Sequence, residues 1–218
     1  MMDRLAGVDT CAVSDAMDQL ELTSGVVAGL RPMSIPRRIA GRVITVRLEE
    51  ARGRRSVNHL GTSAIENVLP GDVIVVAHNG LETVSGWGGL LSLGAALRGS
   101  VGIIIDGACR DIDEMVDLDL PVYARGATPR TARGRVIEAG WNEDIVVGGV
   151  VVSPGDLAIA DRTGVVFIPQ AGAESVVSAA ETIFAREAAM ARALSAGGTM
   201  ASALVSYETL LVKGNGDG

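Results

Sequence analysis

Two short stretches of this chain hold residue types at spacings that could do chemistry. The first, residues 86–92 (GWGGLLS), is a glycine-rich turn that runs into a helical pattern. The second, residues 105–114 (IDGACRDIDE), ends an apolar strand pattern in one arginine and several carboxylates. Free N–H groups at a helix start attract anions, and carboxylate oxygens bind hard divalent cations. Together the two stretches indicate an anion site beside a cation site, which suits a small 2-oxo acid held on a divalent metal.

Arg110 and Asp111 give the clearest chemical signal in the second stretch. They follow Asp106 at the end of the strand pattern, and α/β sheets bind ligands in the crevice beyond their strands' carboxyl ends. Asp111 is an oxygen ligand of the type that Mg²⁺ or Mn²⁺ accepts, and the planar fork of Arg110 matches a carboxylate. The alternative is that Arg110 pairs with a neighbouring carboxylate (Asp106, Asp113 or Glu114) on a surface helix.

The glycines of the first stretch remove side chains where a backbone would approach a ligand. Gly86, Gly88 and Gly89 precede the expected helix, whose first N–H groups are free to bind negative charge. The alternative is a tight turn that packs a helix on a strand. The third glycine of the G-x-G-x-x-G fingerprint is missing, so a nucleotide cofactor is not expected.

Other catalytic residue types give weaker signals. His59 and His78 are the two histidines, and no HxH or HExxH spacing predicts a zinc site. His78 follows a strand pattern and could line the same crevice, although a histidine there is more commonly a hydrogen-bonded residue at a strand end. No serine lies in a G-x-S-x-G setting, so serine hydrolase chemistry has no support.

The composition limits the class of protein. The 218 residues, 48% of them hydrophobic, predict one domain over residues 1–218. A net charge of −7 and a pI of about 4.9 argue against a nucleic-acid partner, because phosphate binding needs a dense positive field. With only Cys11 and Cys109, no disulfide framework is expected. The start of the chain lacks a signal-peptide layout, and no apolar run approaches the roughly 20 residues of a membrane span, so a soluble, cytoplasmic protein is expected.

The hydrophobic periodicity predicts an α/β fold with a mixed sheet. Expected helices cover residues 9–20, a segment opened by a capping box at 63–66, and residues 89–97, 112–116 and 171–194, with a short helix after residue 198. Expected strands cover residues 41–48, 73–77, 101–105 and 157–160, with several more between 135 and 168. Pro-Gly-Asp turns precede two of these strands, and residues 214–218 are expected to fray.

Several longer patterns resemble the RraA-like family. They are GWGGLLS at 86–92, G-x-x-x-D-G-x-x-R-D at 102–111 and V-x-V-x-PGD-x-x-x-AD-x-x-G-V-x-x-x-P at 150–169, with further matches at 13–17 and 39–45. That family contains the regulator of ribonuclease E activity and the 4-hydroxy-4-methyl-2-oxoglutarate/4-carboxy-4-hydroxy-2-oxoadipate aldolases. The resemblance implies an α/β/α-type sandwich like the swivelling phosphohistidine domain, assembled as a homotrimer or a dimer of trimers with clefts between subunits.

The resemblance also implies roles for residues of both stretches. In the aldolases the arginine equivalent to Arg110 binds the substrate's carboxylate and carbonyl oxygens, and the aspartate equivalent to Asp111 is the direct protein ligand of Mg²⁺ or Mn²⁺. Backbone amides at the helix start hold the pyruvate carboxylate; here these belong to Gly88, Gly89, Leu90 and Leu91. The metal would stabilise a pyruvate enolate. The expected reaction is therefore aldol cleavage of a 4-hydroxy-2-oxo acid, decarboxylation of oxaloacetate, or both.

One position departs from the aldolases. They carry an acidic residue upstream of the arginine that orients a metal-bound water for proton transfer, and this chain has Gly89 there. A positioned acid or base contributes on the order of 10²- to 10⁴-fold to rate. Asp106, Glu114, His78 or a carboxylate from a neighbouring subunit could replace it.

The glycine also leaves two other functions open. One is a non-catalytic regulator of the RraA type that binds a protein partner, and the other is a related enzyme in which Gly89 makes room for a different or bulkier substrate. Members of the family have been labelled demethylmenaquinone methyltransferases. That activity is not expected, since no adenosine-binding fingerprint is present.

Overall fold

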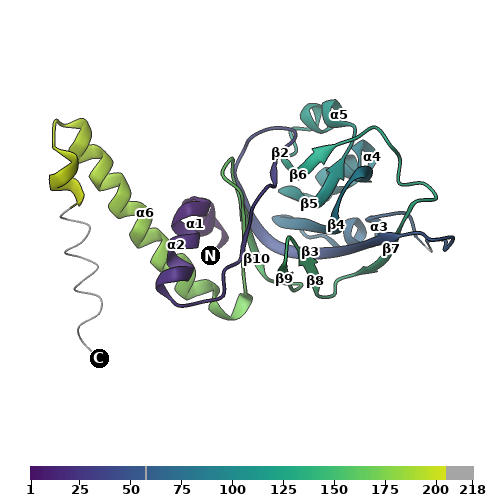
Figure 1. The fold of residues 1–218 in the computed structure, drawn as a ribbon, viewed down its shortest axis with the longest axis horizontal. Coiled ribbons are helices and arrows are strands. Elements are labelled where there is room, and N and C mark those ends of the chain that lie inside the picture. The colour runs from purple at the N-terminus through teal and green to yellow at the C-terminus, as the bar shows by residue number, and fades with distance from the viewer. Residues whose placement is uncertain (57, 205–218) are drawn as a thin grey trace.

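The computed structural model describes residues 1–56 and 58–204 and shows a mixed α/β fold (Figure 1). The strands are β1 (Val26–Val27), β2 (Arg31–Pro32), β3 (Ile39–Glu50), β4 (Asp72–Trp87), β5 (Gly102–Cys109), β6 (Val122–Ala127), β7 (Val136–Trp141), β8 (Ile145–Val147), β9 (Val150–Val152), β10 (Leu157–Ala160) and β11 (Val165–Ile168). The helices are α1 (Met2–Ala6), α2 (Thr10–Gln19), α3 (Thr62–Asn67), α4 (Gly89–Leu97), α5 (Ile112–Asp117) and α6 (Ala173–Ser195), with a 3₁₀ turn at Gln170–Gly172.

A nine-stranded sheet forms the centre of the fold. Its order is β1-β11-β10-β3-β4-β5-β6-β2, with β7 also paired to β3. β3, β4, β5 and β6 are parallel neighbours, whereas β1, β2, β7, β10 and β11 join antiparallel. The prediction of a mixed sheet is therefore confirmed. The alternation of strands and helices in the first half of the chain produces its parallel part.

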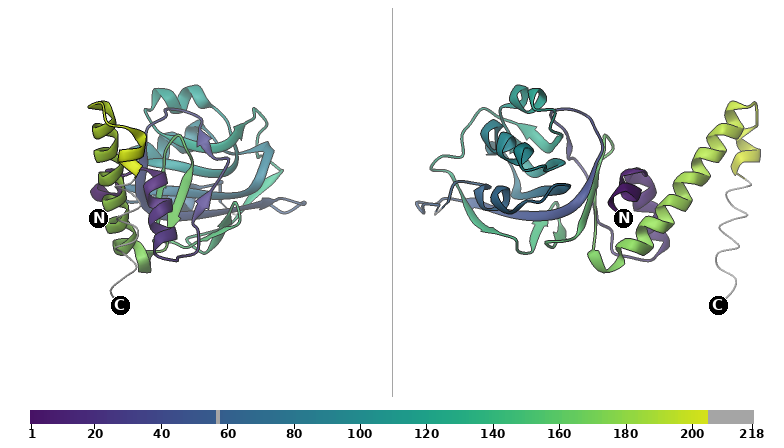
Figure 2. Two further views of the ribbon diagram at one scale, coloured as in Figure 1. Left: turned by 60° about the vertical axis from the view of Figure 1, so that its left-hand side comes forward. Right: turned by 180° about the vertical axis from the view of Figure 1, so that it is seen from behind.

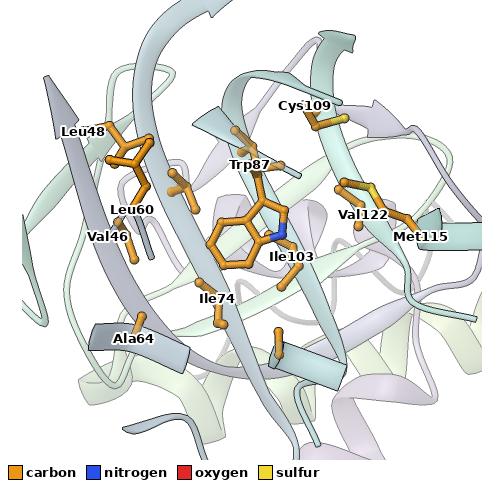
Figure 3. Packing of buried hydrophobic residues seen from close by; sticks show 14 of the residues in the cluster. Val46, Leu48, Leu60, Ala64, Ile74, Trp87, Ile103, Cys109, Met115 and Val122 are labelled. Carbon is orange, nitrogen blue, oxygen red and sulfur yellow. The ribbon is translucent and has the colours of Figure 1, made fainter. Parts of the chain in front are cut away.

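Three apolar clusters hold the layers together. The first lies between one face of the parallel strands and α3, α4 and α5, and Figure 3 shows the Trp87 indole within it among side chains of β3, β4 and β5. The second lies on the opposite face, under the β8–β9 hairpin. The third joins the outer face of β10 and β11 to α1, α2 and α6. The helices α1, α2 and α6 accordingly lie beyond β10, away from α3–α5, and α6 projects outward from the sheet (Figures 1 and 2).

Most of the expected elements are present, and two local expectations were wrong. The strand predicted to end at Ala77 continues to Trp87, because bulges around Asn79 and Gly80, both at positive φ (53° and 68°), let the chain pair again with β5. The capping box predicted at Ser63 does not form. α3 begins at Thr62 after a left-handed Gly61, and an added Cβ on that glycine would lie 2.6 Å from the Trp87 ring.

The ends of the chain agree with the predictions where the structure describes them. Asp9 caps α2 by accepting a hydrogen bond from the Ala12 N–H at 2.8 Å. Residues 200–204 are helical, and the tail predicted to fray at 214–218 lies outside the described residues. Cys11 and Cys109 are free thiols, the first exposed and the second buried. Across residues 1–56 and 58–204, no helix combines the length and apolar character needed to cross a membrane.

Candidate functional site

The two chemically suggestive stretches meet because β4 and β5 end side by side. Trp87, the last residue of β4, is the register partner of Cys109, the last residue of β5. The N–H of Arg110 then donates to the Trp87 carbonyl at 3.0 Å. Because the strands are parallel, the segments that follow them leave the same edge of the sheet. The turn at Gly88 is thereby placed directly against Arg110 and Asp111.

Gly88 is confined between the two segments. An added Cβ at this residue would lie 2.7 Å from Oδ2 of Asp111 and 3.2 Å from Nε of Arg110. Real Cβ atoms are essentially never found closer than 3.0 Å to another heavy atom. A side chain at residue 88 would therefore displace the Asp111 carboxylate from its present position.

The start of α4 presents backbone N–H groups at this edge. The Gly89 N–H donates to Oδ2 of Asp111 at 3.0 Å, and the Ser92 N–H donates to the Gly88 carbonyl at 3.0 Å. Among the described residues, the N–H groups of Leu90 and Leu91 have no hydrogen-bond acceptor. Gly88 has no side chain that could cap them. Two donors at the positive end of the helix dipole are thus free to bind an anion.

Arg110 and Asp111 lie together rather than apart. Nε of Arg110 donates to Oδ2 of Asp111 at 3.1 Å, and the two side chains are 40% and 31% exposed. Asp111 precedes α5 with φ 60° and ψ 45°, a left-handed conformation that aspartate tolerates better than most residues. This turn points its carboxylate back to α4. The fork of Arg110 still has its two terminal nitrogens available for a ligand, because its ion pair in the described structure uses Nε.

Glu114, in the first turn of α5, also lies against Gly89. An added Cβ at Gly89 would overlap Oε2 of Glu114 and would lie 2.6 Å from its Cδ. The Glu114 and Asp111 carboxylates therefore flank the same glycine. α4 and α5 also lie near each other on the same side of the sheet (Figure 1).

The other candidates considered from sequence lie elsewhere. Asp106 pairs with Nε of Arg125 at 2.5 Å and accepts from the Gly148 N–H at 2.9 Å, on the face covered by the β8–β9 hairpin. His78 is 2% exposed and bonds through Nε2 to the Val84 carbonyl at 2.8 Å, so it does not line the crevice. Burial lowers the pKa of His78, and its neutral ring acts as a hydrogen-bonded residue within the sheet.

Cys109 is adjacent to the site but is not a reactive thiol. It is fully buried at the end of β5, and that burial raises its pKa to about 11. A thiol with so high a pKa carries little thiolate at neutral pH, and the thiolate is the nucleophile. The carboxylates, Arg110 and the backbone amides remain as the candidate functional groups at this edge.

The donor set fits a hard, largely hydrated cation. The second oxygen of Asp111 is uncommitted in the described structure, and Mg²⁺ commonly binds through one or two carboxylates with several waters. Within residues 1–56 and 58–204, no group of three or more His, Cys, Asp or Glu side chains is placed to hold a metal ion. A carboxylate oxygen such as that of Asp111 is a ligand type that Mg²⁺ and Mn²⁺ accept.

The site lies on an open surface of the chain. A hollow of about 430 Å³ lies beside Leu48, His78 and Leu81, and a larger one of about 860 Å³ lies near α1 and the amino ends of the parallel strands. Neither is lined by residues 88–91, 110 or 111. At the site itself, the Leu90 residue is 77% exposed and the Arg110 side chain is 40% exposed.

One contact that holds the site was missed from the sequence. The Trp87 Nε1–H donates to Oγ of Ser92 at 3.0 Å, and that hydroxyl donates to the Gly88 carbonyl at 3.0 Å. Both side chains are buried, with Trp87 2% exposed and Ser92 fully buried. The pair fixes the start of α4 to the core. A tryptophan next to the glycines, with a serine one turn into the helix, was the available signal.

Comparison with known proteins identifies relatives. The family profile described as RraA-like (Aldolase/RraA) matches residues 10–167. DlpA of Legionella pneumophila is 27% identical over 207 residues, which cover 95% of this chain but only 34% of DlpA. A protein of Halalkalibacterium halodurans provisionally named 4-hydroxy-4-methyl-2-oxoglutarate aldolase is 31% identical over 188 residues, covering 86% of this chain and 85% of its own.

A solved structure is also similar. RraAS2 of Streptomyces coelicolor, described as an unusual member of the RNase ES inhibitor RraA protein family, matches with a TM-score of 0.76 at 26% identity. The match covers 82% of this chain and 90% of RraAS2. The likeness therefore extends across most of both folds.

Proposed function

Since this chain belongs to the RraA-like family, we propose that it is a divalent-metal-dependent carbon–carbon lyase acting on a small 2-oxo acid. The reaction is cleavage of a 4-hydroxy-2-oxo acid, decarboxylation of oxaloacetate, or both, because each passes through a pyruvate enolate. One observation carries the proposal: the free N–H groups of Leu90 and Leu91 lie at the same sheet edge as the Arg110–Asp111 pair. Names given to homologous aldolases support the lyase class.

Each group of the site has a role that follows from its charge. The N–H groups of Leu90 and Leu91 bind the substrate carboxylate, and the terminal nitrogens of Arg110 hold its carbonyl oxygen. Asp111 would hold Mg²⁺ or Mn²⁺, which when bound supplies Lewis-acid stabilisation of the enolate oxygen. In aldol cleavage the bond between C3 and C4 breaks, its electron pair forms the enolate, and the C4 hydroxyl proton is released. These groups favour the enolate because they are fixed before the charge develops.

The open position of the site agrees with an oligomeric enzyme. Leu90 and the Arg110 side chain are exposed in the single chain, and a homotrimer or a dimer of trimers would place a second subunit over them. In such an assembly the substrate would be shielded from water, which strengthens the electrostatic interactions with Arg110.

The decisive experiment compares Asp111→Asn with Asp113→Asn. Asparagine keeps the size of Asp111, accepts the Gly89 N–H bond and tolerates the left-handed conformation, so the change removes charge with little effect on folding. Asp113 is an exposed carboxylate on the same helix and serves as the matched control. We expect Mg²⁺-dependent formation of pyruvate from oxaloacetate by the unaltered protein and by Asp113→Asn, with at least about a 100-fold loss in Asp111→Asn, since even outer-shell ligand changes cost about 10- to 100-fold. Equal rates in all three proteins would contradict the proposal.

A non-catalytic regulator is the second candidate, favoured by the glycine at position 89 and by the likeness to RraAS2. It predicts no specific Mn²⁺ binding at Asp111. Calorimetric titration with Mn²⁺ distinguishes the two functions. A heat of Mn²⁺ binding that is lost in Asp111→Asn and kept in Asp113→Asn supports the enzyme. The absence of a binding heat in the unaltered protein supports the regulator.

A further inference from the structure

The Glu114 carboxylate occupies the space that a side chain at position 89 would fill. A Cβ built on Gly89 would overlap Oε2 of Glu114, would lie 2.6 Å from its Cδ and would lie 3.1 Å from its Cβ. Each of these contacts is shorter than nine in ten real Cβ contacts. Residue 89 can therefore carry a side chain only if Glu114 moves. The glycine and the glutamate are complementary parts of one packing arrangement.

The left-handed Asp111 explains why Glu114 faces α4. Asp111 precedes α5 and points its carboxylate to the Gly89 N–H, and Glu114 follows three residues later in the first turn. Both carboxylates are directed to the start of α4, as their contacts with Gly89 show. Asp111 meets Gly89 at its nitrogen, and Glu114 meets it on the side where a Cβ would lie.

Glu114 is also an uncommitted carboxylate, and unlike Asp113 it contacts the space beside Gly89. Within the residues that the structure describes, its side chain is exposed and no hydrogen bond or ion pair engages it. Asp111 is held by the Gly89 N–H and Arg110, whereas Asp106 is held by Arg125 on the far face of the sheet. A group that moves protons must be able to gain and lose one near the reacting atoms. Glu114 meets this requirement, and the engaged carboxylates do not.

Resting on the proposed function, we propose that Glu114 is the proton-transfer residue of this site. Its ionised carboxylate takes the proton of the C4 hydroxyl as the bond between C3 and C4 breaks and the electron pair moves into the enolate. The carboxylic acid so formed then gives the same proton to C3 of the enolate, which yields pyruvate and returns the carboxylate to its starting form. No oxidant or further reactant is needed. In oxaloacetate decarboxylation only the second transfer is required, with the proton drawn from solvent through Glu114.

The test uses the exchange of pyruvate methyl protons in D₂O, followed by NMR in the presence of Mg²⁺. This half-reaction needs the enolate and a proton-transfer group but no carbon–carbon chemistry. We expect Glu114→Gln to lose about 10²- to 10⁴-fold in exchange rate and Asp113→Asn to stay within about threefold of the unaltered protein. Mn²⁺ affinity measured by calorimetry should be kept in Glu114→Gln.

A relocated carboxylate supplies the second arm. In the Glu114→Ala background, Gly89→Asp places a carboxylate in the vacated space from the opposite helix, and we expect it to restore exchange at least about tenfold over Glu114→Ala alone. The same variants give a readout that does not depend on activity. Gly89→Asp should lower the melting temperature when Glu114 is present, and much less when Glu114 is alanine.

The outcomes separate this inference from the proposed function. Full exchange in Glu114→Gln, with the unaltered protein active, overturns the role of Glu114 and leaves the lyase in place. A thermal effect of Gly89→Asp that is the same in both backgrounds overturns the shared-space arrangement. No Mg²⁺-dependent exchange by the unaltered protein overturns the proposed function and this inference with it.

Discussion

Replacing Ser92 with alanine tests whether the start of α4 is fixed by the core. The hydroxyl accepts from the Trp87 Nε1–H and donates to the Gly88 carbonyl, each at 3.0 Å, in a fully buried setting. Without it the indole N–H is left unsatisfied, which costs about 1–3 kcal/mol. The Gly88 carbonyl keeps its bond from the Ser92 N–H, so its loss is smaller. We expect a decrease of about 2 kcal/mol in the free energy of unfolding.

Urea unfolding of the unaltered protein, Ser92→Ala, Trp87→Phe and the double variant measures this decrease and tests whether it arises from the bond between the two side chains. Trp87→Phe removes the N–H donor, so Ser92→Ala should cost under about 1 kcal/mol in that background, giving a coupling of about 1 kcal/mol between the two side chains. Ser195→Ala is the matched control. Its hydroxyl also donates to a carbonyl four residues earlier, that of Ala191 at 2.9 Å, but the residue is exposed and the change should stay within about 0.5 kcal/mol.

Two results would refute this reasoning. A cost below about 0.5 kcal/mol for Ser92→Ala would mean that the indole N–H finds another acceptor and the hydroxyl does not fix the turn. An equal cost in the presence and absence of the Trp87 N–H would mean that the two side chains are not coupled. The urea m value should be unchanged, since neither variant alters the surface exposed on unfolding.

Two further predictions concern His78 and Asp161, two titratable groups whose pKa the fold lowers. Burial lowers the pKa of His78 in the fold, so the unfolded chain takes up the proton first as pH falls. The free energy of unfolding should therefore fall as pH drops below about 6.5, by at most about 1.4 kcal/mol per pH unit. Urea unfolding at pH 7.5, 6.5 and 5.5 checks this, and an unchanged pH dependence in His78→Gln would contradict it. Burial opposes ionisation of Asp161, but hydrogen bonds from Thr10 and Thr163 outweigh this effect and lower the pKa of the carboxyl. The contribution of the ionised Asp161 to the free energy of unfolding is therefore present above about pH 4 and is lost as pH falls further. Asp161→Ala should cost about 1.5–3 kcal/mol at pH 7 in a thermal or urea melt, against under about 0.5 kcal/mol for the exposed Asp18→Ala, and equal costs would contradict the role of these bonds.

Sequence patterns predicted the elements whose signals are local. The helix expected at residues 89–97 and the strand expected at 157–160 have those bounds, because a glycine turn or a Pro-Gly-Asp turn marks each start. Sequence patterns gave a wrong start for α3, where a contact with a residue distant in sequence determines the local structure. α3 begins at Thr62, directly after a left-handed Gly61 against which the Trp87 ring packs, and the sequence near residue 61 gives no sign of that contact.

The sequence predicted that the two stretches of the candidate site lie together, but it did not predict the strand pairing that brings them together. Arg110, Asp111 and the α4 amides were all expected at strand ends. That they meet depends on β4 and β5 being parallel neighbours in a register that pairs Trp87 with Cys109. Strand order is set by the packing of the whole sheet, so spacing along the chain could not supply it. The long bulged segment of β4 also delays its end by ten residues beyond Ala77, to the point where β5 ends.

The choice among Asp106, Glu114 and His78 shows why proximity in sequence misleads. Asp106 and Glu114 are both four residues from Arg110, so spacing does not separate them. In the fold, Asp106 extends from β5 to the face under the β8–β9 hairpin, where Arg125 holds it, whereas α5 carries Glu114 on the other face beside α4. The left-handed turn at Asp111 immediately precedes α5, which lies near α4. An acid at residue 89 and a glutamate at residue 114 would compete for one space, so the glycine that first argues against catalysis is the residue that admits Glu114 to the site.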